Sequence, residues 1–204
     1  MKAGRGSRRC IALVVVAVGC VAPAWAAAGA WSWDYNLFVG QKTVGEKDWA
    51  PYEKYQEFGL EASWGKADQP LMFATDVYLA QDDEDESGES VESTALEVDL
   101  GLRKIWKLKK GFHPYFGAGV ALVSADFESI NKGQRTSDED RAAGFWLGGG
   151  CVYRLGPHLN LGIALRVTPV RELNLDGEPR GGTSTSLGIV IGWGSAAAKD
   201  KETK

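Results

Sequence analysis

Hydrophobic and polar positions alternate with a period of two through most of the chain. In "YQEFGLEASWG", which begins at residue 55, the apolar set is Phe58, Leu60, Ala62 and Trp64, and the intervening set is Glu57, Gly59, Glu61 and Ser63. The same alternation recurs in "TALEVDLGLR", "FHPYFGAGVALV" and "LNLGIALRV". A side-chain period of two is the pattern of a β-strand with one apolar face. The chain is therefore expected to be built from strands.

Eight segments show this pattern, and their connections alternate in length. The segments lie at about 33–44, 55–65, 71–81, 92–103, 112–124, 143–154, 159–170 and 183–194. Each segment reaches the ~9 to 11 residues of a tilted membrane strand. The connections 45–54, 82–91, 125–141 and 171–182 are long and polar, and the others are short. This pattern predicts an all-β fold, an eight-stranded antiparallel up-and-down transmembrane β-barrel with both ends on the short-turn side.

The face opposite the apolar one combines glycine with charges of both signs. Small residues and mutually paired charges suit the interior of an eight-stranded barrel, where side chains fill the available space. The apolar face would then point to lipid. The sequence predicts a luminal charge network of Glu57, Glu61, Asp76, Glu97, Asp99, Arg103, Arg154 and Arg166. We expect these charges to fill the lumen as pairs, and the alternative is that they line a pore.

The first residues have the three parts of a secretory signal peptide. A basic start is followed by the apolar run "CIALVVVAVGCVA" and by small residues in "PAWAAAGA". The apolar run is too short for a membrane helix, and the small residues after it place the expected cleavage near Ala26. The predicted organisation is a signal peptide at 1–26, a barrel at 27–194 and a short charged periplasmic tail at 195–204.

Charge and cysteine content narrow the possible partners. Removal of the signal peptide changes the formal net charge from −4 to −8, which disfavours nucleic acid as a partner. Cys10 and Cys20 leave with the signal peptide, so Cys151 has no intramolecular partner for a disulfide. No zinc-type cluster of ligands is seen, and no cofactor is predicted.

The last strand, "SLGIVIGWG", ends the apolar pattern with a tryptophan. Ser186, Gly188, Ile191 and Trp193 stand at the polar, glycine, hydrophobic and aromatic positions of the final-strand signal of outer-membrane barrels. Together with the export signal and the alternating loops, the chain resembles the small eight-stranded outer-membrane barrels of the OmpA/OmpX type. This resemblance implies an outer-membrane location in a Gram-negative-type cell. It also implies contact with the barrel assembly machinery, outer-membrane lipid and lipopolysaccharide.

The segment "QDDEDESGES" is the most acidic part of the chain. Asp83, Asp85 and Ser87 are spaced like the start of a calcium-binding loop, but Thr94 stands where a bidentate glutamate is needed. A solvated acidic loop is therefore expected rather than a specific metal site. Weak bridging by divalent cations to lipopolysaccharide phosphates is an alternative for the acids Asp82, Asp83, Glu84, Asp85, Glu86 and Glu89.

A basic segment, "RKIWKLKKG", is predicted at a short periplasmic turn. Its lysines are placed to meet anionic inner-leaflet headgroups or periplasmic polymers. The simpler interpretation is that the turn anchors the barrel vertically, with Ile105 and Trp106 at the membrane interface.

Catalysis is not expected. Some eight-stranded barrels modify lipid A and need a histidine beside a serine and an acid near the outer leaflet. His113 and His158 are both predicted at the periplasmic end, one barrel height from Ser124 and Asp126.

The predicted function is that of a non-enzymatic integral outer-membrane barrel whose surface loops bind an unknown ligand, in envelope integrity, adhesion or recognition. The alternatives are a narrow pore for small solutes, an exported soluble lipocalin-like carrier and a lipid A-modifying enzyme. A soluble carrier would require the apolar faces to point inward.

Overall fold

Eight strands make up most of the computed structural model, which describes residues 31–45, 54–66, 69–86, 89–131, 134–175 and 178–195. The predicted signal peptide and nearly all of the predicted tail lie outside these residues. The strands are β1 (Trp31–Val44), β2 (Lys54–Lys66), β3 (Met72–Glu86), β4 (Glu89–Ile105), β5 (Phe112–Asn131), β6 (Gln134–Leu155), β7 (Leu159–Leu175) and β8 (Glu178–Gly194).

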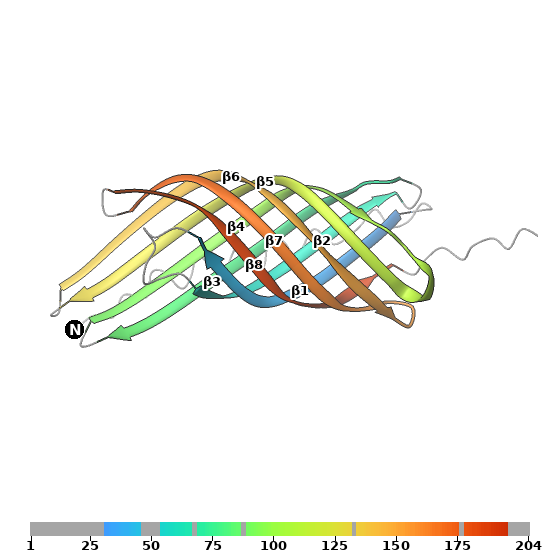
Figure 1. The fold of residues 1–204 in the computed structure, drawn as a ribbon, viewed down its shortest axis with the longest axis horizontal. Coiled ribbons are helices and arrows are strands. Elements are labelled where there is room, and N and C mark those ends of the chain that lie inside the picture. The colour runs from blue at the N-terminus through green and yellow to red at the C-terminus, as the bar shows by residue number, and fades with distance from the viewer. Residues whose placement is uncertain are drawn as a thin grey trace, which may run out of the picture. The chain divides into compact units, whose positions relative to one another are not determined.

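The strands form one closed barrel in sequence order (Figure 1). Neighbouring strands from β2 to β8 run antiparallel, and the barrel closes where β8 pairs antiparallel with β1, with Gly188 opposite Gly40 and Trp193 opposite Tyr35. A closed barrel leaves no unpaired sheet edge, which is the condition for strands to cross a bilayer. The predicted fold class is confirmed.

Three of the predicted long loops are wrong in extent. Residues 82–86 and 89–91 continue β3 and β4, and residues 125–131 and 134–141 continue β5 and β6. The β7–β8 hairpin likewise includes residues 171–175 and 178–182. Beyond the bilayer both faces of a hairpin meet water, so the alternation of apolar and polar residues disappears while the backbone pairing continues. These hairpins project from one end of the barrel (Figure 1).

The apolar faces point outward. Exposed apolar side chains occur on every strand, among them Leu37, Phe58, Phe73, Leu100, Phe116, Leu147, Ile163 and Ile189. On β5 this face runs from Phe112 to Leu122, which spans about 25 Å of bilayer at 3.3 Å per residue and a tilt of about 40°. The soluble-carrier alternative is therefore wrong, because it needs these faces inside.

Aromatic residues mark the short-turn end of the apolar belt. Trp64 pairs with Phe73, Phe112 with Tyr153, and Trp193 with both Tyr35 and Leu159. Aromatic girdles of this kind sit at the membrane interface, where amphipathic rings meet headgroups. Long hairpins face the outside in such barrels, so the short turns are the periplasmic ones.

The β4–β5 turn contains the short 3₁₀ segment η2 (Lys109–Gly111). Lys110 and Gly111 both have positive φ, 64° and 79°. A Cβ at Gly111 would lie 2.8 Å from the Arg154 carbonyl oxygen, so glycine is needed there for space as well as for conformation. Among the described residues, no helix is long and apolar enough to span a membrane.

Candidate functional site in the barrel lumen

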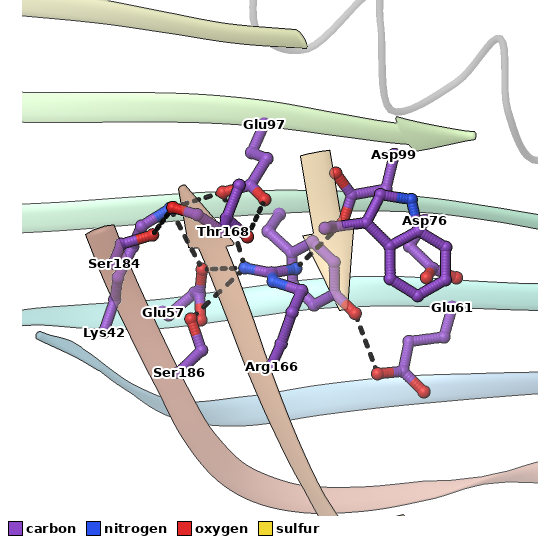
Figure 2. Close-up of polar contacts among 12 residues, drawn as sticks. Lys42, Glu57, Glu61, Asp76, Glu97, Asp99, Arg166, Thr168, Ser184 and Ser186 are labelled. Carbon is purple, nitrogen blue, oxygen red and sulfur yellow. Dashed lines mark hydrogen bonds and ion pairs between the residues drawn. The ribbon is translucent and has the colours of Figure 1, made fainter. Parts of the chain in front are cut away.

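Arg166 on β7 is the centre of the largest group of paired charges in the lumen (Figure 2). One guanidinium nitrogen lies 2.7 Å from the Glu57 carboxylate and 3.6 Å from that of Glu97. A second lies 3.5 Å from Asp99. The guanidinium carbon is 3.3 Å from the centre of the Tyr78 ring, so the cation also lies against an aromatic face. Four strands are thereby linked across the interior through one side chain.

Lys42, on β1, extends this group toward the outer end. Its ammonium contacts Glu97 and lies 3.8 Å from Glu57. Thr168 donates a hydrogen bond of 2.8 Å to the second oxygen of Glu97. Glu97 therefore has a cation and a hydroxyl on its two oxygens, which is how a buried carboxylate is stabilised. Sequence reasoning missed Lys42, although it lies on the same face of β1 as its inward neighbours.

Three carboxylates lie in one row across the wall of the barrel. Glu61 on β2 is opposite Asp76 on β3, and Asp76 is opposite Asp99 on β4. Opposed residues have Cβ atoms about 4.5–5.5 Å apart, a spacing at which like charges repel. Tyr78 donates 2.8 Å to Glu61, whereas neither oxygen of Asp99 accepts a hydrogen bond within the described lumen. Asp99 is the least satisfied acid of the row.

Arg103 occupies the layer nearer the periplasm. It pairs with Asp76 at 2.5 Å and donates 3.0 Å to Ser63. Its guanidinium carbon lies 5.3 Å from the Tyr115 ring and 5.8 Å from the Trp146 ring. The cation is thus held by one carboxylate and two aromatic rings, all of them buried.

Aromatic side chains and glycines together close the middle of the lumen. The buried rings are Phe38, Tyr78, Tyr115 and Trp146. A Cβ at Gly59 would overlap the Tyr78 ring, and one at Gly188 would lie 2.6 Å from the Phe38 ring. The inward glycines therefore make room for rings on neighbouring strands. Sequence reasoning recognised the glycines as interior residues but did not pair them with these aromatics.

Small cavities lie among the described side chains of the lumen. The central one measures about 10 Å³ and is lined by residues that include Arg103, Trp146 and Arg166. A cavity of that size holds about one water molecule. A second cavity of about 50 Å³ lies toward the outer end, next to Lys42 and Tyr55. In the part of the lumen that the structure describes, the side chains of the central layer are packed around this small cavity.

The periplasmic end is closed by a separate polar cluster. Arg154 contacts the carboxylate of Asp34 and donates 2.9 Å to Asn160. Asn160 in turn donates 3.1 Å to Asp34. In the β4–β5 turn, Lys107 donates 2.9 Å to Ser32. Burial lowers the pKa of the Lys107 ammonium, Asp34 opposes this shift, and Arg154 adds to it.

All eight residues of the predicted charge network are buried in the lumen. The structure brings seven of them into the central layers, whereas Arg154 belongs to the periplasmic cluster. Among the described residues, the buried acids are Asp34, Glu57, Glu61, Asp76, Glu97 and Asp99, and the buried bases are Lys42, Arg103, Arg154 and Arg166. The acids outnumber the bases, so the interior disfavours a further anion.

The structure keeps His113 apart from Ser124 and Asp126, the residues considered for lipid A chemistry. His113 is buried at the periplasmic end of β5, and Ser124 lies about 36 Å further along the same strand at 3.3 Å per residue. His158, in the β6–β7 turn, has its Nδ1 3.0 Å from the Gly194 carbonyl oxygen. No group of three or more His, Cys, Asp or Glu side chains within the described ranges is arranged to hold a metal ion.

The acidic segment continues the β3–β4 hairpin. The backbone of Asp82, Asp83, Glu84, Asp85 and Glu86 belongs to β3, and that of Glu89 belongs to β4. Ser87 lies outside the described residues, and so do the side chains of the acids from 83 to 89. The weak calcium hypothesis for Asp83, Asp85 and Ser87 therefore stays a prediction.

The residues of the predicted assembly signal lie on both faces of β8. Ser186 points inward and accepts 3.2 Å from Arg166, and Gly188 lies opposite Gly40 of β1. Ile191 and Trp193 point to lipid and are 43% and 52% exposed. The signal thus lies on the strand that closes the barrel. Its reading by the assembly machinery stays a prediction.

The fold and the lipid-facing belt define an integral outer-membrane barrel. Residues 11–196 match the outer membrane protein beta-barrel domain, and the chain belongs to this family. No curated protein sequence matches the chain.

Several solved structures share the fold. Neisserial surface protein A is 15% identical with a TM-score of 0.55, and the alignment covers 81% of this chain and 99% of that one. Ail, the attachment invasion locus protein of Yersinia pestis, is 13% identical with a TM-score of 0.56, covering 82% and 99%. A major outer membrane protein from Thermus thermophilus is 13% identical with a TM-score of 0.54, covering 80% and 98%. At these identities the likeness shows the fold alone.

Proposed function

We propose that the protein is a non-enzymatic surface barrel that acts through the segments at its outer end, in recognition or in stabilising the envelope. The observation that carries this proposal is the packed central layer. Arg103, Trp146 and Arg166 leave a space of about 10 Å³ there, which supports a role other than solute transport. The strands meanwhile continue past the apolar belt as paired hairpins at the outer end (Figure 1).

The charge of the outer segments indicates the chemistry of a partner. Residues 45–54, 82–92, 126–141 and 171–181 together contain eighteen acidic and seven basic residues. A surface of this sign attracts cationic groups, or binds anionic lipopolysaccharide only through divalent cations. A structure of Ail, also similar in fold, contains the heparin analogue sucrose octasulfate. The acidic outer end of this chain disfavours such a polyanion.

Shortening one hairpin tests this proposal. Residues 84–91 would be replaced by Asn-Gly, a dipeptide that favours a two-residue hairpin turn. Cells that display the wild-type barrel are expected to adhere more strongly to a polylysine surface than to a heparin surface, and the short hairpin should reduce the difference. The matched control shortens the β7–β8 hairpin by replacing 173–180, which removes two acids and one base. Equal adhesion of the wild-type barrel and the barrel shortened at 84–91 would contradict the proposal.

The enzymatic alternative has its own readout. The family and the solved neighbours are generally non-enzymatic barrels, and His113 lies far from Ser124. We expect overexpression of the protein to leave the mass spectrum of lipid A unchanged. A new lipid A species that disappears in His113→Ala would contradict the non-enzymatic proposal.

A further inference from the structure

The β4–β5 turn places cations beside exposed apolar side chains at the periplasmic rim of the barrel. Lys104 is opposite Phe116, a residue of the lipid-facing belt, and therefore shares its face of the sheet. Trp106 and Leu108, two and four residues later, are 40% and 51% exposed. Lys110 is also exposed. A turn with both kinds of side chain is suited to the boundary between acyl chains and headgroups.

Backbone contacts hold this turn in place. The Trp106 amide donates to the Pro114 carbonyl, and the Leu108 amide donates to that of Phe112. The Lys107 ammonium donates to Ser32 of β1, which fastens the turn to another strand at the end of the barrel. Lys104, Lys110 and the exposed apolar residues are therefore presented on a fixed segment.

Lys104 is positioned at the level of the interface. Its ammonium lies 5.2 Å from the centre of the Trp106 ring, a cation–π contact that keeps the charge close to the ring. The periplasmic turns 65–71, 104–111 and 155–158 contain five basic residues and one acid, Asp68. The sign is opposite to that of the outer segments, and the four lysines of 104–110 supply most of it.

We propose that the β4–β5 turn binds the headgroup of an anionic phospholipid in the inner leaflet of the outer membrane. Lys104 and Lys110 would meet the phosphate, and Trp106 and Leu108 would lie against the glycerol and upper acyl region. The occupant is a lipid rather than a soluble polymer, because the apolar half of the surface continues the lipid-facing belt at Phe116. This inference concerns the periplasmic rim and does not depend on what the outer hairpins bind.

Competition between lipids tests the proposal. The folded full-length mature barrel in an uncharged detergent is mixed with phosphatidylglycerol and phosphatidylcholine, and the bound lipids are counted by native mass spectrometry. We expect phosphatidylglycerol to be retained preferentially. A basic residue near an anionic membrane surface contributes about 1 kcal/mol, or about 5-fold in affinity, so Lys104→Gln/Lys110→Gln is expected to reduce the preference about 30-fold.

The matched control is Lys54→Gln/Lys66→Gln, which removes the same charge from both ends of β2 and should keep the preference. Lys104→Arg/Lys110→Arg should also keep it, because the charge remains. Trp106→Ala/Leu108→Ala should weaken retention of phosphatidylglycerol, which a purely electrostatic attraction would not show.

Two outcomes would overturn the proposal. One is equal loss of preference in the Lys54→Gln/Lys66→Gln control, which would mean that only net charge matters. The other is displacement of the bound lipid by soluble polyglutamate or by inorganic phosphate at matched charge concentration. That result would mean that the turn binds a soluble anion rather than a membrane lipid.

Discussion

Replacing Arg166 by methionine removes the cation that links four strands of the lumen. The guanidinium lies 2.7 Å from Glu57, 3.5 Å from Asp99 and 3.6 Å from Glu97. At an effective dielectric constant of 20, each contact corresponds to about 5–6 kcal/mol of gross Coulomb energy. Most of this Coulomb energy offsets the desolvation of the buried ions. The net change in stability therefore comes from leaving a buried charge without its partner.

Loss of one partner from a buried ion pair costs about 3–5 kcal/mol, because the other charge stays buried. Lys42 still contacts Glu97 and lies 3.8 Å from Glu57 in the variant, whereas Asp99 loses the guanidinium. We therefore expect Arg166→Met to lower the free energy of unfolding by about 3–5 kcal/mol. The double variant Arg166→Met/Asp99→Asn should recover about 1–2 kcal/mol of this, since it removes the abandoned carboxylate.

The assay is urea unfolding of the barrel in lipid vesicles, followed by tryptophan fluorescence. Arg141→Met makes the same chemical change at an exposed position of β6 and should cost at most about 1 kcal/mol. A loss below about 1 kcal/mol for Arg166→Met would refute the reasoning. It would mean that water enters the lumen and screens these charges.

Three further predictions follow from the lumen and from the last strand. Asp99→Asn should leave the free energy of unfolding unchanged or raise it, because neither oxygen of Asp99 accepts a hydrogen bond from the described residues. Asp76→Asn should lower the free energy of unfolding by about 3 kcal/mol, because it leaves Arg103 buried without its carboxylate. Equal losses of stability in the two variants would contradict this difference. Gly188→Leu should lower the free energy of unfolding by at least about 1 kcal/mol, because its Cβ would lie 2.6 Å from the Phe38 ring; an unchanged free energy of unfolding would show that Phe38 moves freely. Trp193→Ser should reduce the amount of folded barrel in outer membranes, measured by heat-modifiable gel mobility, and an unchanged amount would argue against the assembly signal.

The alternation of residues predicted which face of each strand is buried, because lipid and lumen select opposite side chains. The inward positions of Glu57 and Glu97 followed directly from that rule. Their partners did not, because pairing depends on which strands meet across the lumen, as with Arg166 of β7 and Glu57 of β2. Lys42 was missed for a related reason, since a lone lysine near the end of a strand resembles a surface residue.

Aromatic residues indicated less reliably than charged residues which side chains lie inside the barrel. Aromatic residues on the strands of such barrels are typical of the interface girdle, yet Phe38 and Trp146 lie inside. Their neighbours carry the missing clue, because Gly40 and Gly188 leave the space that Phe38 fills. The hairpin extensions escaped prediction because water on both sides removes the selection for alternation, although pairing continues from 125 to 131 opposite 134 to 140.

Conductance across a planar bilayer shows whether the packed lumen is closed to ions. We expect the purified barrel, inserted from its heat-modifiable folded form, to show no stable ohmic steps at any applied voltage. Trp146→Gly removes the largest side chain of the packed layer and serves as a comparison under the same conditions. Steady conductance steps of the wild-type barrel would contradict the closed lumen, and function would then have to be sought in transport rather than at the outer hairpins.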